Sequence, residues 1–353
     1  MTVKIGINGF GRIGRCTLKR CIEMDGIDVV GINDLANIED LAYLLKYDSI
    51  SGWYNKEVTN VDNHIQVDGK DIAFFSSREP SQIPWKDVGA DIVVESSGAF
   101  RRREKAAGHI EAGAKKVIIS APSDDADATI VMGVNENMYQ KEEHNVISLA
   151  SCTTNSLAPV VKVLNDTFGV ESLFFTTIHA YTSSQSLMDT PARHRQRGRA
   201  AALSIIPTTT GAAKATEKVL PELKGRMNGM AMRVPVPDGS ITDITAIVKK
   251  DTTPEEVNNA FYQAAEKPEF INILRVSNEA LVSRDILGDC HSAVVDAEGT
   301  AVVNGRVVKV LSWYDNEWGY SCRLVDFALY INKVENQSYS LSGSSSGHKT
   351  INQ

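Results

Sequence analysis

A glycine-rich segment near the N-terminus has the residue types and spacing that bind a dinucleotide. The segment GFGRIG at 9–14 follows an apolar run and opens a stretch with helical apolar spacing. In such a fingerprint Gly9 permits the tight turn, Gly11 lets the backbone approach a pyrophosphate, and Gly14 lets helix and strand pack closely. The free amides and positive dipole end of the following helix then attract phosphate.

An acidic residue at the expected distance favours NAD. Asp34 ends the second apolar run about 20 residues after Gly14, where this fingerprint places the acid that binds the ribose hydroxyls. A carboxylate repels a 2′-phosphate, and Leu35 beside it offers no donor, so NADP is disfavoured. The alternatives are a glycine-rich turn without a ligand and, for Asp34, a turn or helix-capping acid.

A cysteine and a histidine are the candidates for covalent catalysis. Cys152 lies where a helix is predicted to begin, and a helix N-terminus lowers a thiol's pKa and favours the thiolate. His179 ends a predicted strand and is the kind of base that such a nucleophile needs. Spacing does not show that the two meet, and the alternatives are a buried apolar cysteine and a hydrogen-bonded core or interface histidine.

The other cysteines sit in helix or strand patterns and are interpreted as structural: Cys16, Cys21, Cys290 and Cys322. No Cys/His set has zinc spacing, so no metal is expected.

The elements that must position these residues fall into two groups. The first half is predicted to contain strands at 3–8, 28–33, 91–95 and 116–120 and helices at 12–24, 38–46 and 102–111. This βαβα order predicts a doubly wound, mostly parallel Rossmann sheet. The second half is predicted to contain helices at 153–168, after Pro254 and at 316–332, strands at 173–179, 227–234 and 240–250, and an aperiodic stretch at 181–204. Asp-Gly at 68–69 and Asn-Gly at 304–305 predict hairpins.

This pattern predicts an α/β Rossmann domain and an α+β catalytic domain with a mixed or antiparallel sheet. The predicted dinucleotide domain comprises 1–151 and 315–333, and the catalytic domain comprises 152–314. The Ser- and Gly-rich segment 336–353 is predicted to be a disordered tail.

Composition narrows the classes of partner. With 37 Lys+Arg against 44 Asp+Glu, the net charge of −7 disfavours nucleic acid or an anionic membrane as the main partner. No apolar run reaches the roughly 18 residues of a membrane span, and no signal or transit peptide is recognisable. Five cysteines without regular spacing indicate a reducing cytoplasm. The basic segment RHRQRGR at 193–199 opposes the overall charge.

From Lys4 to about Asn332 the sequence resembles the phosphorylating glyceraldehyde-3-phosphate dehydrogenase family. The matching segments are INGFGRIGR at the start, KKVIISAPS at 115–123, ASCTTNSLAPV at 150–160, TIHAYT at 177–182, GRAAALSIIPTTTGAAKA at 198–215, RVPVPD at 233–238 and WYDNEWGYS at 313–321. The resemblance implies a cytoplasmic homotetramer of glycolysis or gluconeogenesis. It implies oxidation of glyceraldehyde 3-phosphate with NAD and inorganic phosphate, through a hemithioacetal and a thioester.

The resemblance also implies residue roles. Cys152 would be the nucleophile and His179 the base. The residues implied to hold the substrate phosphate and inorganic phosphate are Ser151, Thr153, Thr182, Arg197, Thr210, Gly211 and Arg233. The residues implied at the cofactor are Arg12, Ile13, Asp34, Arg78, Ser120, Asn316, which would orient the nicotinamide amide, and Tyr320, which would pack near the nicotinamide.

Two phosphate-sized anions do require arginines, hydroxyls and backbone amides. The alternatives are a solvated strand-end charge for Arg233 and a helix N-cap at 208–210. Because 193–199 carries more cations than the family pattern, Arg195 or Arg199 could replace Arg197.

Two other functions are considered. The related erythrose-4-phosphate dehydrogenase is disfavoured because TTTGAAK at 208–214 matches the glyceraldehyde enzyme. A noncatalytic nucleotide- or RNA-binding role is disfavoured by the intact Cys152, His179 and Arg233.

Overall fold

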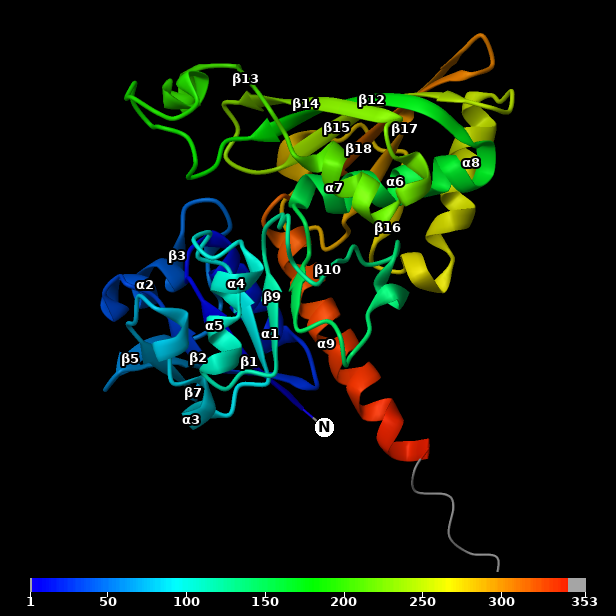
Figure 1. The fold of residues 1–353 in the computed structure, drawn as a ribbon. Coiled ribbons are helices and arrows are strands. Elements are labelled where there is room, and N and C mark those ends of the chain that lie inside the picture. The colour runs from blue at the N-terminus through cyan, green and yellow to red at the C-terminus, as the bar shows by residue number, and fades with distance from the viewer. Residues whose placement is uncertain (1, 342–353) are drawn as a thin grey trace, which may run out of the picture.

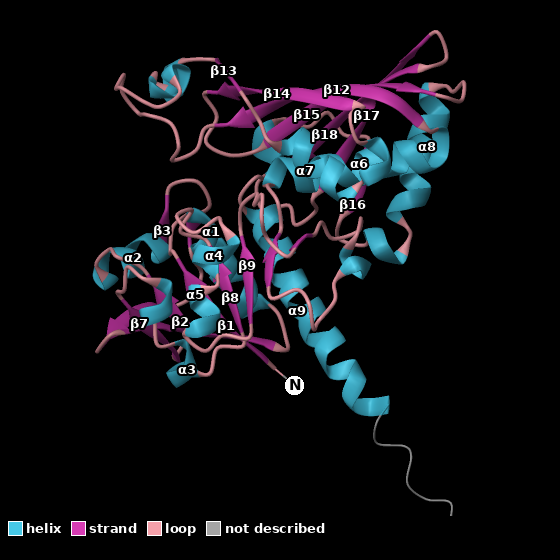
Figure 2. Ribbon diagram, in the orientation of Figure 1, coloured by secondary structure: helices cyan, strands magenta, loops and turns pink. Residues whose placement is uncertain are grey.

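The computed structural model describes residues 2–341, and within that range the chain forms two large β-sheets with helices packed on them (Figures 1 and 2). Over these residues the first sheet has nine strands, in the order β10-β11-β9-β8-β1-β2-β7-β6-β5. Their bounds are β1 (Val3–Asn8), β2 (Ile27–Asn33), β5 (Val58–Val61), β6 (His64–Val67), β7 (Lys70–Phe75), β8 (Ile92–Glu95), β9 (Lys116–Ile119), β10 (Ala128–Thr129) and β11 (Val146–Ser148). The β5-β6 and β6-β7 pairs are antiparallel, and the other pairs are parallel.

Helices cover both faces of this sheet because its central strands are apolar on both sides. Ile92 and Val94 of β8 join a core with α1 and α9, whereas Val93 between them packs with Trp85 of α3 on the opposite face. The helices of this part are α1 (Arg12–Glu23), α2 (Ile38–Lys46), α3 (Trp85–Val88), α4 (Arg103–Ala106), α5 (Gly108–Glu111) and α9 (Trp318–Leu341). A short ribbon pairs β3 (Tyr47–Asp48) with β4 (Gly52–Trp53). Although α9 comes last in the chain, it therefore belongs to the first core.

Among the described residues the second sheet has seven strands, in the order β13-β14-β12-β15-β18-β17-β16. Their bounds are β12 (Val170–Ala180), β13 (Ile206–Thr208), β14 (Met227–Val234), β15 (Ser240–Val248), β16 (Leu274–Ser277), β17 (Ala293–Val303) and β18 (Val307–Tyr314). The β12-β14 and β16-β17 pairs are parallel, and the rest are antiparallel. One face packs against α6 (Cys152–Phe168), α7 (Ala212–Val219) and α8 (Pro254–Ala265). Figure 2 shows these helices on the side of the sheet that faces the first sheet.

This architecture confirms the predicted fold class: a mostly parallel doubly wound sheet and a second, mixed sheet. Both predicted hairpins are present, joining β6 to β7 and β17 to β18. Asp68 and Gly69 have φ of 49° and 76°, and Asn304 and Gly305 have φ of 50° and 69°. Positive φ at both central residues is the turn geometry that Asp-Gly and Asn-Gly favour.

Two predicted helices differ from the structure. The helix predicted at 102–111 is two short helices, α4 and α5, and a Cβ at Gly108 would lie 3.1 Å from Pro80 Cβ. The helix predicted to end at Asn332 continues to Leu341, because Val334 still packs on the core and Asn336 Nδ2 donates to Asn332 O at 2.7 Å. Residues 336–341 of the predicted tail are therefore helical, and 342–353 lie outside the described residues.

Along 2–341, no helix is both long and apolar enough to span a bilayer.

Candidate active site

The chain makes a constrained turn immediately before Cys152. Ala150, which follows β11, has φ of 54°, a left-handed conformation that costs a non-glycine residue about 1–3 kcal/mol. Ser148 Oγ accepts from Ala150 N at 3.1 Å, and Tyr320 OH donates to Ala150 O at 3.2 Å. Asn155 Nδ2 donates to Leu149 O at 2.8 Å. Sequence reasoning missed Ser148 and Asn155, since their role depends on a turn that no local motif announces.

This turn and the end of β12 bring the predicted nucleophile and base together. Cys152 begins α6, and its Sγ lies 3.4 Å from His179 Nε2. His179 Nδ1 lies 2.7 Å from Ala180 O and 2.9 Å from Arg233 Nη1, and it donates its hydrogen to the carbonyl oxygen in the tautomer that frees Nε2. The Nε2 lone pair then faces the thiol, which is the arrangement a general base needs.

The pair is neutral at rest. Burial, assisted by the positive charge of Arg233, lowers the pKa of His179 to about 3, so its imidazole is uncharged at neutral pH. Burial raises the pKa of the Cys152 thiol, although Arg233 and a hydrogen bond from the Thr153 amide act in the opposite direction. The net shift of the Cys152 pKa is therefore upward, opposite to the direction predicted from the helix N-terminus, and burial is its largest cause. Proton transfer to His179 must accompany nucleophilic attack.

Two arginines form the cationic side of the site. Arg233 is aligned with His179 in the parallel β12-β14 pair, and its Nη1 donates to Ala180 O at 2.8 Å. Its buried Nε has no hydrogen-bond partner among the described residues, which leaves it available to an anion. Arg197 Nε donates to Thr208 Oγ1 at 3.1 Å, and its charge contributes to lowering the pKa of both His179 and Arg233.

The structure distinguishes among the arginines of the basic segment. Arg199 pairs at the surface with Asp189 at 2.8 Å, and Arg195 is exposed in the short 3-10 helix Arg195–Gly198. Arg197 is the cation of this segment whose charge reaches His179. The geometry therefore favours Arg197 over the two alternatives.

The remaining predicted anion-binding residues surround α6 and α7. Ser151 Oγ caps α6 by accepting from Thr154 N at 3.1 Å, and Thr153 Oγ1 lies 3.0 Å from Tyr314 OH. Thr210 Oγ1 accepts from Ala212 N at 3.2 Å at the start of α7, which Gly211 precedes. Thr182 Oγ1 lies 2.8 Å from Ser184 Oγ. Ser151 is thus the N-cap of α6, whereas the N-cap of α7 is Gly211, and Thr210 binds the first amide of that helix from the 208–210 segment for which a cap was the alternative.

The glycine fingerprint fits a dinucleotide. Gly9 has φ of 90°, and a Cβ there would lie 2.4 Å from Ser97 Cα. A Cβ at Gly14 would lie 2.2 Å from Gly9 O, whereas the Cβ position of Gly11 has no atom within 4 Å. The helix α1 begins without a side-chain cap, so its first amides, at Arg12 and Ile13, remain available to phosphate.

The other predicted cofactor residues follow strands of the first sheet or lie at the start of α9. Asp34 accepts from Phe10 N at 2.7 Å and from Ala36 N at 2.9 Å, so it also has the turn role that was its alternative. Ser120 follows β9, and Arg78 is exposed after β7. Asn316 is buried, and its Oδ1 accepts from Ser240 Oγ at 2.5 Å. Tyr320 is buried beneath the turn at Ala150.

The Arg12 side chain points away from a phosphate role. Its guanidinium binds Glu317 through Nε and Nη2 and Asp48 through Nη1. Glu317 lies just before α9 and Asp48 lies in β3, so these ion pairs join the start of α1 to both. A contact between Arg12 and a cofactor would therefore use its backbone amide.

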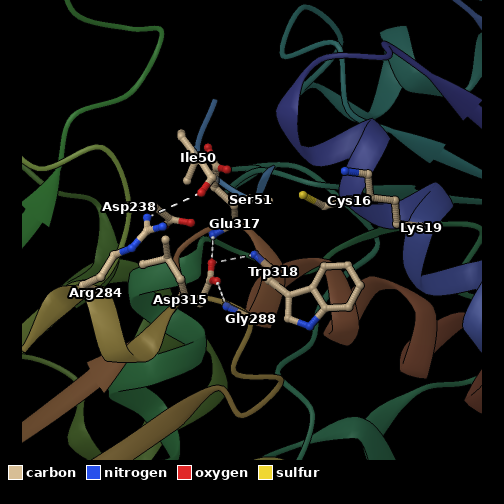
Figure 3. A pocket seen from close by; sticks show the side chains of 11 residues that line it. Cys16, Lys19, Ile50, Ser51, Asp238, Arg284, Gly288, Asp315, Glu317 and Trp318 are labelled. Atoms are coloured by element: carbon tan, nitrogen blue, oxygen red, sulfur yellow. Dashed lines mark hydrogen bonds between the residues drawn. The ribbon is translucent and has the colours of Figure 1, made fainter. Parts of the chain in front are cut away.

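A cavity of about 340 Å³ lies beside this junction. Figure 3 shows Cys16 and Lys19 on the α1 side and Asp238 and Arg284 on the opposite side, with Asp315 and Glu317 between them. Burial raises the pKa of Asp238 to about 9, and its carboxyl donates a hydrogen bond to Asp315. The cavity thus adjoins both neighbours of Asn316, and its lining includes neither Cys152 nor His179.

Comparison with known proteins identifies the family. Residues 3–103 match the family model described as glyceraldehyde 3-phosphate dehydrogenase, NAD binding domain, and 151–316 match the corresponding C-terminal domain. Glyceraldehyde-3-phosphate dehydrogenase of Geobacillus stearothermophilus is 54% identical over 331 residues, covering 94% of this chain and 98% of that protein. Glyceraldehyde-3-phosphate dehydrogenase 2 of Bacillus subtilis is 53% identical over 331 residues, covering 94% and 97%. The chain therefore belongs to the glyceraldehyde-3-phosphate dehydrogenase family, as its sequence motifs predict.

Proposed function

We propose that this chain oxidises glyceraldehyde 3-phosphate with NAD and inorganic phosphate to 1,3-bisphosphoglycerate. The observation that carries the proposal is the 3.4 Å approach of Cys152 Sγ to His179 Nε2 beside the uncommitted Arg233 Nε. A nucleophile, a base and a cation in one place are what an aldehyde bearing a phosphate requires. The identity of 51–54% to curated glyceraldehyde-3-phosphate dehydrogenases over nearly the whole chain supports the same activity.

The chemistry begins with the neutral pair. His179 Nε2 takes the thiol proton as Cys152 Sγ bonds to the aldehyde carbon, and the proton passes to the carbonyl oxygen to give a hemithioacetal. His179 then removes the hydroxyl proton, while the Cys152 backbone N–H and the imidazole stabilise the developing oxyanion. NAD, when bound, supplies the acceptor for the hydride that leaves the same carbon. The product on Cys152 is a thioester.

Inorganic phosphate completes the reaction. Its oxygen attacks the thioester carbon, the C–S bond breaks, and protonated His179 returns a proton to the departing sulfur. We assign the two phosphate-sized sites to Arg197 and Arg233 with the hydroxyls and amides of Ser151, Thr153, Thr182, Thr210 and Gly211. Charge-assisted hydrogen bonds from arginine are the strongest that the site can offer to these anions.

We assign the cofactor to the carboxyl ends of the first sheet. Gly9, Gly11 and Gly14 with the amides of Arg12 and Ile13 would hold the pyrophosphate, and Asp34 would bind the ribose hydroxyls. Asn316 would orient the nicotinamide amide, with Tyr320, Ser120 and Arg78 nearby. In this assignment 1–151 with 315–333 form the dinucleotide domain and 152–314 the catalytic domain.

We further propose that the chain acts as a homotetramer in the cytoplasm. The open face of the second sheet carries exposed apolar side chains, including Phe174, Met230 and Ile247. Such a surface on a sheet is suited to packing against another copy. All five cysteines are free, as a reducing compartment would leave them.

Steady-state kinetics test the proposed function. We expect turnover of glyceraldehyde 3-phosphate that needs inorganic phosphate, prefers NAD to NADP and exceeds turnover of erythrose 4-phosphate. Cys152→Ser should still bind NAD but should lose at least roughly 1,000-fold in kcat, because the covalent nucleophile is missing. Near-normal turnover by this variant, or a strong preference for NADP, would contradict the assignment.

A further inference from the structure

A second group of reactive side chains lies outside the proposed active site. Asp289, Cys290 and His291 occupy the loop between the 3-10 helix Ser283–Ile286 and β17. Asp289 Oδ1 lies 2.7 Å from His291 Nδ1, and one polar atom from each of the three side chains lies within 4.8 Å of the others. All three residues are half-buried and reach solvent. The prediction that Cys290 sits in a helix or strand pattern is therefore wrong.

Neighbouring elements hold this group in place. Arg275 of β16 donates from Nε and from Nη2 to Asp289 Oδ2, both at 2.8 Å. The backbone N–H of His291 donates to Asp289 Oδ1 at 2.8 Å. Gly319 of α9 packs so closely that a Cβ there would lie 2.8 Å from His291 O. The carboxylate that orients His291 is thus fixed by several donors.

The electrostatics of the loop favour charge separation. Burial opposes a charged imidazole, but hydrogen bonds to Asp289 and Cys290 outweigh it and raise the pKa of His291 to about 9. The hydrogen bond with His291 lowers the pKa of the Cys290 thiol, and the charges of His291 and Arg323 act in the same direction. Burial and the charge of Asp289 oppose this shift without reversing it. An imidazolium beside a thiolate is the pairing that makes a cysteine nucleophilic.

The other noncatalytic cysteines provide the contrast. Cys16, Cys21 and Cys322 are 5%, 2% and 0% exposed. Burial raises the pKa of each thiol, to about 12 for Cys21 and Cys322. These three are therefore inert internal references within the same chain.

We propose that Cys290 is a second reactive thiolate of this protein, a modification site that attacks small peroxides with His291 as proton donor and Asp289 as its orienting group. Cys290 Sγ bonds to one oxygen of hydrogen peroxide, and the O–O bond breaks. The sulfur loses two electrons and becomes a sulfenic acid, while the departing hydroxide takes the His291 proton and leaves as water. His291 is then neutral and still hydrogen-bonded to Asp289.

The surroundings suit an anionic sulfur better than a metal cation. Arg275 already occupies Asp289 Oδ2, and Arg323 adds a second guanidinium whose buried Nε has no hydrogen-bond partner among the described residues. Arg323 pairs with Asp326 at 2.6 Å, and its charge still lowers the pKa of Cys290. The guanidinium groups of Arg275 and Arg323 both oppose the entry of a divalent ion.

The test uses the full chain with Cys152→Ser, which removes the active-site thiol. Iodoacetamide labelling followed by peptide mass spectrometry should modify Cys290 at least tenfold faster at pH 7 than Cys16, Cys21 or Cys322. The Cys290 rate should rise less steeply between pH 6.5 and 8 than that of an ordinary thiol, which gains roughly tenfold per pH unit below its pKa. Hydrogen peroxide should give a sulfenic acid at Cys290 that dimedone traps.

Two variants and one control separate the proposal from simple exposure. His291→Asn and Asp289→Asn should slow labelling at pH 7 at least fivefold and restore the steep pH dependence. His64→Asn, which changes an exposed histidine of β6, should leave both unchanged. With Cys152 restored, dehydrogenase activity of each variant reports that it folds.

Three outcomes would overturn the proposal. The first is that Cys290 labels no faster than the buried cysteines, and the second is that His291→Asn labels as fast as the parent. Equimolar Zn²⁺ that protects Cys290 until a chelator is added would show a cation site instead.

Discussion

At the scale of single residues, one hydroxyl links the two halves of the proposed active site. Ser240 Oγ donates to Asn316 Oδ1 at 2.5 Å and accepts from Ala180 N at 3.1 Å. Because Asn316 Oδ1 is bound in this way, its amide nitrogen is turned away from Ser240. The residue after His179 and the residue assigned to the nicotinamide amide thus share one fully buried anchor.

Ser240→Ala tests this anchor. We expect kcat/KM for NAD to fall about tenfold, since an unpartnered buried polar group costs about 1–3 kcal/mol. Thr242→Val is the matched control, because Thr242 lies on the same strand with a buried hydroxyl that has no partner among the described residues. Kinetics and thermal unfolding of both variants measure the effect. Equal activity in the two variants would show that Ser240 positions nothing.

The basic segment offers a matched pair of arginines. Arg197→Ala should raise KM for glyceraldehyde 3-phosphate or inorganic phosphate by roughly 10–100-fold, the equivalent of one charge-assisted hydrogen bond. Arg199→Ala should change either KM less than twofold, because Arg199 pairs with Asp189 at the surface. Steady-state titration of both substrates measures this. The opposite order of effects would move the phosphate contact to Arg199.

At the scale of elements, the start of α9 depends on a buried pair of carboxyl groups. Asp315 accepts from Glu317 N at 2.9 Å and Trp318 N at 2.7 Å through Oδ1, and from Gly288 N at 2.8 Å through Oδ2. The protonated carboxyl of Asp238 donates a further hydrogen bond to the carboxylate of Asp315. The pair therefore joins the end of the second sheet to the helix that packs on the first.

This pair makes stability depend on pH. Burial, followed by repulsion from Asp315, raises the pKa of Asp238 to about 9, so the folded chain keeps a proton that the unfolded chain releases above about pH 4. Stability should therefore fall as pH rises from about 4 to 9. Asp238→Asn retains a donor to Asp315 and should flatten this slope, as measured by Tm at several pH values.

The control for this slope is a carboxylate at the surface. Asp124→Asn changes an exposed partner of Lys214 and should keep the parent slope over the same pH range. If Asp238→Asn and the parent lose Tm equally between pH 5 and 9, the buried proton is not held by Asp238.

Local patterns predicted the elements more fully than the contacts between them. The glycine fingerprint, the helix at Cys152 and the hairpins are encoded by neighbouring residues, so their types and positions were predictable. The left-handed Ala150 is fixed by Tyr320, and the bond from Ser240 to Asn316 joins residues 76 positions apart. The sign of the Cys152 pKa shift likewise depends on how much of the protein surrounds the sulfur. Such features arise from tertiary packing, which periodicity does not contain.

At the scale of the whole molecule, the net charge of −7 and the cationic site are compatible because the site's arginines are concentrated beside one cysteine. The open face of the second sheet is the other large-scale feature. Phe174, Thr176 and Ile178 alternate on β12 with buried neighbours, and Met230 and Met232 lie directly beside them on β14. A face of this kind is covered when two sheets pack together.

Phe174→Glu tests the proposed assembly at this face. Phe174 is 69% exposed in the single chain, so a charge there should leave the fold intact but oppose packing against another copy. We expect the parent to sediment with four times the 38.5 kDa mass of one chain, and the variant to form a smaller assembly.

The control is Val61→Glu, which changes an exposed apolar position on β5 of the first sheet and should keep the parent mass. Because tetramers need at least two kinds of contact when they are built from paired interfaces, a dimeric variant would assign this face to one of them. An unchanged mass would mean that the open face of the sheet is not a subunit interface.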